Sequence, residues 1–526
     1  MPSAPCDIAS VDDLQNGQMK EVEVSGRKIL LARVNGRFHA VSGQCPHYGA
    51  SLARGVLCGD RVVCPWHKAV FRVTNGELLE PPALDSLTCY EAGVNGDRVV
   101  IELPDAHPPT QARKKAANGD NRTFVLAGAG AAGTAAAENL RQLGFQGRIV
   151  MLSGEAELPY DRTKLSKEFL SGNAGAEELL LRPPDFWERH EVELVTQRVA
   201  EIKTDEHKLI LSDRSTLSYD RLLLATGSTP RKIGIPGHDL GNIFTLRSQA
   251  DAQRIFDAAQ PGVRTVVIGG SFIAMEAASC LALRKLPVAV VIAENSPFAK
   301  QLGPQVGCIM QKWHESHGVV FRLSSEVERF EGTGIVRHVV LKSGERLPAD
   351  LVVAGIGVRP ATDFTADIPK REDGGIPADA HLQAAQDVYV AGDAAVFYET
   401  YSGLPARIEH WRVAAQQGRV AAGNMLGKQN PFEGVPFFWT NHFGTRFDYL
   451  GHAEDWDEII LQEGEELPAF LAFYVKDGRV VAASACGYDR DMAALHELMR
   501  LRRTPSPNEI RKGVDLVTLA QSLCRA

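Results

Sequence analysis

Two short segments near the N-terminus carry residue types that bind transition metals. The first contains Cys45 and His47 and the second contains Cys64 and His67, so the pattern reads Cys-x-His-x16-Cys-x2-His. Two thiolates and two imidazoles can hold one tetrahedral zinc ion. They can also hold a two-iron cluster in which both cysteines bind one iron and both histidines bind the other. Each segment carries one cysteine and one histidine, which favours the cluster, because structural zinc sites usually repeat a Cys-x2-Cys or His-x3-His half.

The pattern and the short strands around it resemble a Rieske ferredoxin domain over most of residues 7–103. The resemblance implies a [2Fe–2S] cluster with the metal ligands Cys45, His47, Cys64 and His67. Rieske proteins of high potential carry an extra disulfide, whose two positions are occupied here by Ala50 and Trp66. We therefore expect a cluster of the lower-potential ferredoxin type, suited to accepting electrons from a flavin.

Two further residues, Lys68 and Cys58, lie close to these motifs. The residue after the second ligand histidine is commonly glycine in the family, and here it is Lys68. We expect an exposed loop lysine; the alternative is a cation that raises the potential of the cluster. The nine cysteines are an odd number spread thinly along the chain, which argues against a disulfide framework. We accordingly expect Cys58 to be a free thiol.

A glycine-rich turn of the kind that binds dinucleotides follows an apolar segment at 124–127. It contains Gly128, Gly130 and Gly133 and opens a helical stretch. Such glycines permit a tight turn, close approach of a pyrophosphate and close helix–strand packing, and the helix N-terminus attracts the phosphates. Glu155 follows the next apolar segment and is expected to contact the ribose.

A second turn of this kind begins at Gly269, with Ser271 and Ala274 in place of the other two glycines. Both residues are small, so the turn is still expected. Glu294 follows the next strand, where a carboxylate suits a 2′-hydroxyl and repels a 2′-phosphate, which favours NAD over NADP. The alternative for Glu294 is a solvated residue at the end of a strand.

Three further segments point to a family: LLLATGS at 222–228, DLVVAGIGVRP at 350–360 and VYVAGD at 388–393. With the two glycine-rich turns, they make residues 122–526 similar to the FAD/NAD-dependent ferredoxin reductases related to apoptosis-inducing factor. Together with the Rieske segment, the whole chain resembles the apoptosis-inducing-factor-like subfamily. The resemblance implies an FAD domain that is interrupted by an NAD domain and followed by a C-terminal interface domain.

The expected fold is therefore multidomain, with an all-β Rieske domain, two α/β nucleotide-binding domains of the glutathione-reductase type and an α+β C-terminal domain. The expected boundaries are 1–105 for the Rieske domain, 106–121 for a linker, 122–242 and 377–430 for the two parts of the FAD domain, 243–376 for the NAD domain, and 431–526 for the interface domain.

The resemblance also implies the residues that meet the cofactors FAD and NADH. The FAD contacts, beyond the first glycine-rich turn, are Glu155, Arg162, Lys167, Val199, Thr226, Gly227, Gly392, Asp393, Glu409, His410 and Trp439. The NAD contacts are Gly269, Ser271, Phe272, Ile273, Glu294 and Gly355. The catalytic group is expected to comprise Lys167, Glu276 and Trp411. Lys167 is expected to pair with Glu276 near the flavin N5, and these groups position and tune rather than transfer protons, because hydride transfer depends mainly on orientation. Trp411 and Trp439 could instead be core aromatic residues.

The positions of the remaining cysteines exclude a disulfide reductase. Residues 155–171 contain no cysteine, and Cys280 and Cys308 are far apart, whereas disulfide reductases need a redox-active cysteine pair near the flavin or in the NAD domain. We therefore expect electrons to leave the flavin through the Rieske cluster.

The composition of the 526-residue chain indicates no nucleic-acid or membrane partner. Its formal net charge is −8 and it has no long basic block, so it offers no electrostatic attraction to either surface. No signal peptide or apolar membrane span is apparent, and the cytoplasm is the expected location.

These observations predict an NADH-dependent flavoprotein ferredoxin reductase with a built-in Rieske ferredoxin, which passes electrons to an unidentified acceptor protein such as an oxygenase. The alternative is a redox-sensing interaction protein, in which the Rieske segment reports the state of the flavin. A terminal oxygenase is not expected, because two nucleotide folds occupy residues 122–430 and leave no room for a mononuclear-iron domain. A homodimer is an open expectation.

Overall fold

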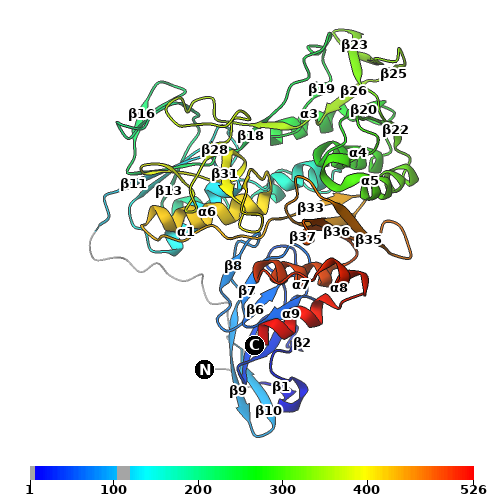
Figure 1. Cartoon of the computed structure of the whole chain (residues 1–526). Coiled ribbons are helices and arrows are strands. Elements are labelled where there is room, and N and C mark those ends of the chain that lie inside the picture. The colour runs from blue at the N-terminus through cyan, green and yellow to red at the C-terminus, as the bar shows by residue number, and fades with distance from the viewer. Residues whose placement is uncertain (1–5, 104–118, 526) are drawn as a thin grey trace.

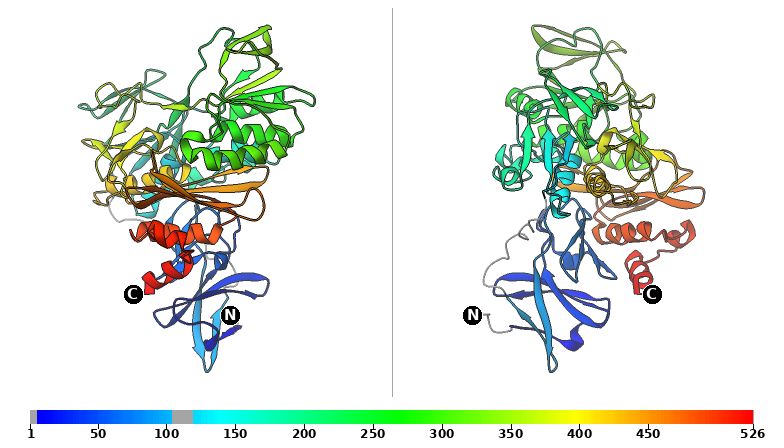
Figure 2. Two further views of the ribbon diagram at one scale, coloured as in Figure 1. Left: turned by 45° about the vertical axis from the view of Figure 1, so that its right-hand side comes forward. Right: turned by 90° about the vertical axis from the view of Figure 1, so that its left-hand side faces the viewer.

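The computed structural model describes residues 6–103 and 119–525. The Rieske part (blue) and the C-terminal helices (red) lie side by side at one end of the molecule, and the two nucleotide-binding parts lie at the other (Figure 1). The sheet that precedes the C-terminal helices lies between the two ends, and both rotated views in Figure 2 agree on this order. The predicted linker, 106–121, falls mostly outside the described residues.

The Rieske part is built from two antiparallel sheets. The larger has the order β1 (Cys6–Ser10), β10 (Arg98–Glu102), β9 (Cys89–Asn95), β4 (Arg37–Ser42), β3 (Arg27–Val34) and β2 (Met19–Val24). The smaller has the order β5 (Val56–Cys58), β6 (Arg61–Val63), β7 (Val70–Arg72) and β8 (Leu78–Glu80). Asn35 and Gly36 both have positive φ in the two-residue turn between β3 and β4, as a tight hairpin requires.

A largely parallel six-stranded sheet carries the first glycine-rich turn. Its order is β13 (Val192–Val195), β12 (Arg148–Leu152), β11 (Thr123–Ala127), β17 (Arg221–Leu224), β30 (Val388–Val390) and β29 (Gln383–Ala385). Its helices include α1 (Ala131–Gln142), α2 (Phe186–Arg189) and α6 (Trp411–Met425). Strand β17 pairs in parallel with β30, so the chain leaves this sheet after β17 and returns to it more than 160 residues later.

The intervening segment forms a second parallel sheet around the second glycine-rich turn. Its order is β19 (Ile243–Phe244), β26 (Leu351–Ala354), β20 (Thr265–Ile268), β21 (Val288–Val291) and β22 (Val320–Arg322), and its helices are α3 (Gln249–Ala258), α4 (Phe272–Leu283) and α5 (Ala299–Ser316). Strands β20 and β26 are buried on both faces, which explains why they read as unbroken apolar runs.

Small sheets connect or cover these two folds. They are β14 (Val199–Lys203) with β15 (Lys208–Leu211) and β16 (Thr216–Ser218), β18 (Ser228–Pro230) with β27 (Val358–Pro360), β23 (Val327–Thr333) with β24 (Ile335–Leu341) and β25 (Arg346–Pro348), and β28 (Ile376–Pro377) with β31 (Ala395–Tyr398) and β32 (Pro405–Ala406).

The C-terminal part is a five-stranded antiparallel sheet followed by helices. The strand order is β33 (Phe437–His442), β34 (Thr445–Gly451), β37 (Arg479–Cys486), β36 (Phe470–Lys476) and β35 (Glu458–Glu463), and the helices are α7 (Asp489–Arg500), α8 (Pro507–Arg511) and α9 (Leu516–Arg525). One buried valine from each of β5, β6 and β7 (Val56, Val63 and Val70) belongs to the same apolar cluster as Phe437 and residues of α7 and α9. The Rieske part is therefore packed against the C-terminal part through a common core.

Candidate redox site

Two loops with the same hydrogen-bond pattern carry the four predicted cluster ligands. The first follows β4, and the second lies between β6 and β7. The N–H of Cys45 donates to the carbonyl of Ala50, and the N–H of Cys64 donates to that of Ala69, both at 2.8 Å. Two equivalent turns thus present one cysteine and one histidine each toward the same place.

The ligands are arranged as a pair of thiols and a pair of imidazoles. His47 Nδ1 and His67 Nδ1 lie 3.0 Å apart, and the thiols of Cys45 and Cys64 lie close enough for each to shift the pKa of the other. Among the described residues, no three metal-binding side chains converge on one ion position. Two pairs suit a two-iron cluster with separate cysteine and histidine irons better than one tetrahedral zinc ion.

Burial keeps both imidazoles in the form that binds metal. It lowers the pKa of His47 to about 3 and that of His67 well below its ordinary value. Neutral imidazole is the ligating form, so both side chains fit the group implied by their motif.

Lys68 is not the exposed loop lysine that the sequence suggested. Its side chain is fully buried, and its ammonium donates to the carbonyl of Pro65 at 2.6 Å and to the carboxylate of Asp448 at 2.7 Å. Its backbone has φ of 57°, the left-handed region in which glycine is favoured. The expectation was wrong because the partner, Asp448, lies on β34 of the C-terminal part, 380 residues away in sequence.

The first glycine-rich turn is closed to any side chain at two of its positions. A Cβ on Gly128, whose φ is +129°, would lie 2.1 Å from the carbonyl oxygen of Ala225, and one on Gly133 would lie 1.8 Å from that of Gly128. Gly130, just before α1, faces open space. This is the geometry that lets a pyrophosphate reach a helix N-terminus.

Buried polar atoms near this turn lack partners of their own. The hydroxyl of Thr226 and Nδ1 of His410 have no hydrogen-bond partner among the described residues. Buried polar atoms are normally paired, so a ligand such as FAD fits here. Gly227 adjoins Thr226 and has φ of +67°.

Asp393 and Gly392 lie beside the same turn and are both hydrogen-bonded. The Asp393 carboxylate accepts from the hydroxyl of Ser228 at 2.6 Å and from Arg247 at 2.9 Å. The N–H of Gly392 donates to Gln417 at 2.7 Å. These bonds hold the segment that was predicted to contact FAD.

Four other predicted FAD contacts lie in this part of the chain. Glu155 forms an ion pair with Arg162, so two residues predicted separately lie together. Burial raises the pKa of Glu409, which pairs with Arg407. Val199 lies at the start of β14 and is half-buried.

The second glycine-rich turn has the same closure in the NAD part. A Cβ on Gly269, whose φ is +115°, would lie 2.3 Å from the carbonyl oxygen of Gly355. Ser271 precedes α4, and its hydroxyl donates to that carbonyl at 3.3 Å. Ile273, in the first turn of α4, is exposed next to Phe272. Glu294 pairs with Lys300, a cation that the sequence interpretation did not consider.

Lys167 and Glu276 meet between the two nucleotide folds. Lys167 Nζ lies 3.1 Å from the carboxylate of Glu276, which also accepts hydrogen bonds from the hydroxyls of Ser166 and Thr440. His442 Nε2 lies 2.9 Å from the Thr440 hydroxyl. Since Thr440 has one proton and the carboxylate can only accept, Thr440 donates to Glu276 and accepts from His442. This chain fixes the orientation of Glu276.

Strand β33 lies between this group and the cluster loops. Neighbouring side chains on a strand point to opposite faces, so Thr440 and Trp439 face opposite sides of it. Thr440 contacts Glu276 on one face. On the other face the ring of Trp439 lies 4.4 Å from that of His67 and 5.8 Å from that of His47. One strand thus contacts the Lys167–Glu276 pair and both predicted cluster imidazoles, a contact that the sequence reasoning did not foresee.

Trp411 lies at the start of α6, where it lines a small cavity with the Rieske segment Pro81–Leu84 and with residues of α1. It therefore takes part in the contact between the Rieske and FAD parts. Its expected role beside the flavin stays a prediction.

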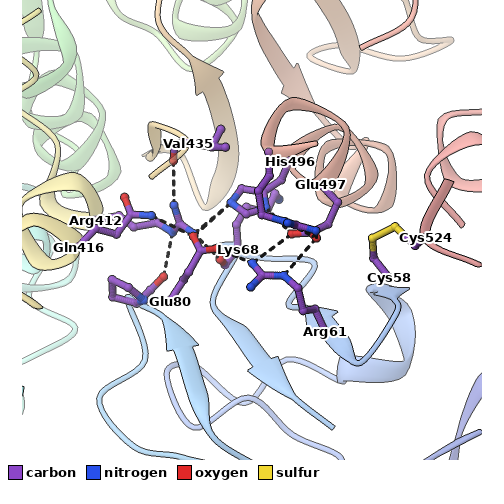
Figure 3. Close-up of polar contacts among 12 residues, drawn as sticks. Cys58, Arg61, Lys68, Glu80, Arg412, Gln416, Val435, His496, Glu497 and Cys524 are labelled. Atoms are coloured by element: carbon purple, nitrogen blue, oxygen red, sulfur yellow. Dashed lines mark hydrogen bonds and ion pairs between the residues drawn. A yellow bond between two sulfur atoms is a disulfide. The ribbon is translucent and has the colours of Figure 1, made fainter. Parts of the chain in front are cut away.

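A buried polar network joins the Rieske part to the rest of the chain (Figure 3). Arg412 is fully buried and donates to Glu80 at 2.7 Å and to the carbonyls of Pro81 and Lys68 at 2.8 and 2.9 Å. Arg61 bridges Glu80 and Glu497. Burying a charge is costly unless it is paired and hydrogen-bonded, and each charge of this network has such a partner.

Cys58 is not a free thiol. It is bonded to Cys524, 466 residues away in sequence, with Cα atoms 5.1 Å apart (Figure 3). The sequence could not reveal the pair, because α9 lies against β5 only in the folded chain.

Comparison with known proteins places the chain in a family. Residues 122–418 match the pyridine nucleotide-disulphide oxidoreductase family, residues 4–91 the Rieske [2Fe-2S] domain, and residues 437–520 the reductase C-terminal domain. Apoptosis-inducing factor 3 of Mus musculus is 38% identical over 96% of this chain and 85% of its own length. The biphenyl dioxygenase system ferredoxin–NAD(+) reductase component of Paraburkholderia xenovorans is 33% identical over 74% of this chain and 96% of its own length.

Among solved structures, the covalent putidaredoxin reductase–putidaredoxin complex contains a chain that superposes with a TM-score of 0.73 at 30% identity, covering 78% of this chain and all of its own. In residues 6–103 and 119–525, no helix combines the length and apolarity needed to cross a membrane. The predicted flavoprotein fold, the cofactors FAD, NAD(H) and [2Fe–2S], and the oxidoreductase class are confirmed. The chain belongs to the pyridine nucleotide-disulphide oxidoreductase family, in its apoptosis-inducing-factor-like branch that joins a Rieske domain to a ferredoxin reductase.

Proposed function

We propose that electrons from NADH cross β33 within one chain, from the flavin site to the Rieske cluster, and then pass to a separate acceptor protein. The contact of Trp439 with both ligand imidazoles carries the proposal. Its neighbour Thr440 is hydrogen-bonded to Glu276 on the opposite face, so the two redox sites share one wall. FAD, when bound, accepts a hydride and passes electrons on singly.

The residues around the flavin site act by holding groups in place. Thr440 and Ser166 fix the carboxylate of Glu276, and Glu276 in turn holds the ammonium of Lys167. We propose that this pair positions the reacting edge of the flavin. Orientation of this kind is the main contribution that a protein makes to hydride transfer.

The acceptor is proposed by class. The relatives include ferredoxin reductase components of dioxygenase and O-demethylase systems, which supports an oxygenase-type acceptor. We further propose NADH as the preferred donor, on the strength of Glu294. The domain boundaries, the cytoplasmic location and assembly as a homodimer stay predictions.

An anaerobic titration of the full-length holoprotein with NADH, followed by EPR, tests the proposal. We expect a rhombic signal typical of a Rieske cluster to grow as NADH is added. Cys45→Ser should abolish this signal and cytochrome c reduction while keeping NADH-dependent reduction of artificial flavin oxidants. Cys89→Ser is the matched control, because Cys89 is an exposed, unbonded cysteine of the same domain, and it should keep both activities. A flavin that NADH reduces while the cluster stays oxidised contradicts the relay and supports the sensor alternative.

A further inference from the structure

The bond between Cys58 and Cys524 joins two distant parts of the chain. Cys58 ends β5 of the Rieske part and is 3% exposed, and Cys524 is a half-buried residue of α9. The bond lies next to the buried network of Arg61 and Glu497 (Figure 3). Neither cysteine belongs to the cluster motif or to the flavin site.

Helix α9 acts as a cover over the contact between the Rieske and C-terminal parts. Its residues Leu516 and Ala520 are buried in the apolar cluster that also contains Val56 and Val63 of the Rieske part and Leu495 of α7. The rest of the helix is more exposed. A short helix that buries few residues is weakly held on its own, so a covalent bond at its end contributes substantially to its position.

We propose that Cys58 and Cys524 form a reversible thiol–disulfide site, which exchanges with low-molecular-weight disulfides and dithiols and latches α9 onto the Rieske domain. The two sulfurs differ in access. Ser522 and Leu523 beside Cys524 are exposed, whereas Cys58 is enclosed. Exchange rates depend on which sulfur an incoming thiolate can reach, so attack occurs at Cys524.

Reduction of the bond by a dithiol takes two exchange steps. One thiolate of a dithiol attacks the sulfur of Cys524, the bond to Cys58 breaks, and Cys58 leaves as a thiolate that takes up a proton. The second thiol of the reagent, deprotonated, attacks the mixed disulfide and releases Cys524 as a thiol. Two electrons and two protons pass from the dithiol to the protein, and the reagent becomes a disulfide. Closing the latch reverses both steps, with a low-molecular-weight disulfide such as glutathione disulfide as the oxidant.

The state of the Cys58–Cys524 bond controls how firmly α9 is held against the Rieske domain. With the bond closed, α9 cannot leave β5 without exchange. With the bond open, the helix is held only by its buried apolar residues, and it should open more often together with the strands beneath it.

The bond itself is tested by equilibrating the holoprotein in glutathione buffers of increasing oxidised fraction, followed by acid quenching, alkylation and tryptic mass analysis. We expect the peptides 55–61 and 513–525 to be linked in oxidising buffer and separate in reducing buffer, with a two-electron transition. Cys89 and Cys308, which are exposed and unbonded, are the internal controls and should form only mixed disulfides with glutathione. If both peptides stay separate in every buffer, stay linked in every buffer, or link to other cysteines, the proposal is overturned.

Hydrogen–deuterium exchange then tests the latch. Reduction should speed exchange in α9 and β5 of the wild type by at least about tenfold, and Cys524→Ser should show the fast rate in both buffers. Cys308→Ser is the matched control and should behave as the wild type. The direct comparison of oxidised with reduced wild type tests the latch without any substitution. Equal exchange in the oxidised and reduced wild type overturns the latch.

Discussion

Arg412 gives the sharpest test of how the Rieske domain is held. Its guanidinium is fully buried and donates to Glu80, Pro81 and Lys68 of the Rieske part, and also to Val435 and His496 of the C-terminal part. Most of these bonds cross the domain contact. Arg412→Met, which keeps an aliphatic side chain of similar reach, should therefore weaken the docking of the Rieske domain.

The expected loss of docking free energy follows from the groups that Arg412→Met leaves without their partner. Removing one member of a buried ion pair costs about 3–5 kcal/mol. Glu80 keeps its ion pair with Arg61 at 2.5 Å, so the low end applies. A loss of about 3 kcal/mol corresponds to an increase of about 150-fold in the open fraction.

Arg419→Met is the matched control, since Arg419 lies on the same helix, α6, and donates once to the same Rieske segment, at Leu78, over 3.2 Å. One such bond contributes about 1 kcal/mol, or about fivefold. Hydrogen exchange of residues 56–80 in the holoproteins measures both, and the flavin spectrum checks that the cofactor site is intact. The reasoning is refuted if the two variants open to the same extent, or if Arg412→Met exchanges like the wild type.

Three further predictions concern the same contact. Lys68→Met should lower the reduction potential of the cluster by an amount on the order of tens of millivolts, because it removes a buried cation beside the cluster loop; a potentiometric EPR titration that finds no shift contradicts this. Burial alone would raise the pKa of Glu497, but the hydrogen bond from His496 and the charge of Arg61 outweigh it and lower this pKa to about 2. The lowered pKa stabilises the fold by about 3 kcal/mol above pH 4.5, and this stabilisation should be lost as the pH falls toward 2. The difference in urea midpoint between wild type and Glu497→Gln should therefore shrink between pH 4.5 and pH 2 and stay constant above pH 4.5. Trp439→Leu should slow reduction of the cluster by NADH much more than reduction of the flavin in stopped flow, and equal slowing would argue against a path through the indole.

Local motifs explain what the sequence could predict. The cluster ligands and both glycine-rich turns depend on residues close together in sequence. The Asn-Gly pair at 35–36 likewise favours a two-residue hairpin turn, and the structure has that turn. A second Asn-Gly pair, at 95–96, favours the same kind of turn, but there the turn lies one residue later, because Asn95 pairs with Arg98 and leaves Gly96 and Asp97 as the turn. A shift of this kind depends on strand pairing rather than on the turn sequence alone.

Contacts between domains explain what the sequence could not predict. Lys68, Trp439 and the Cys58–Cys524 bond all depend on the Rieske part packing against a segment more than 350 residues away. Only Lys68 offered a signal. A lysine where the family commonly has glycine must adopt a strained left-handed backbone, which costs about 1 kcal/mol. Such a cost indicates that the side chain makes a compensating contact. Nothing near Cys524 distinguishes it from a free cysteine.

The covered imidazole edge constrains how electrons leave the cluster. His67 is 7% exposed and its ring lies against Trp439, so the edge at His67 is closed to a second protein while the Rieske domain is docked. Trp66, in the same ligand loop, and Tyr48, in the other, are each 37% exposed. We expect a protein acceptor that meets the docked state to approach along Trp66, which adjoins His67 in sequence. An acceptor that needs the imidazole edge must wait for the contact to open, which breaks the network of Arg412.

The two routes predict opposite results with cytochrome c as acceptor. Along Trp66, Trp66→Ala slows delivery and Arg412→Met does not speed it. Through opening, Arg412→Met speeds delivery and Trp66→Ala has little effect. Because the buried charges of this contact are paired across it, we expect the first result, and the second would show that the Rieske domain works as a released carrier.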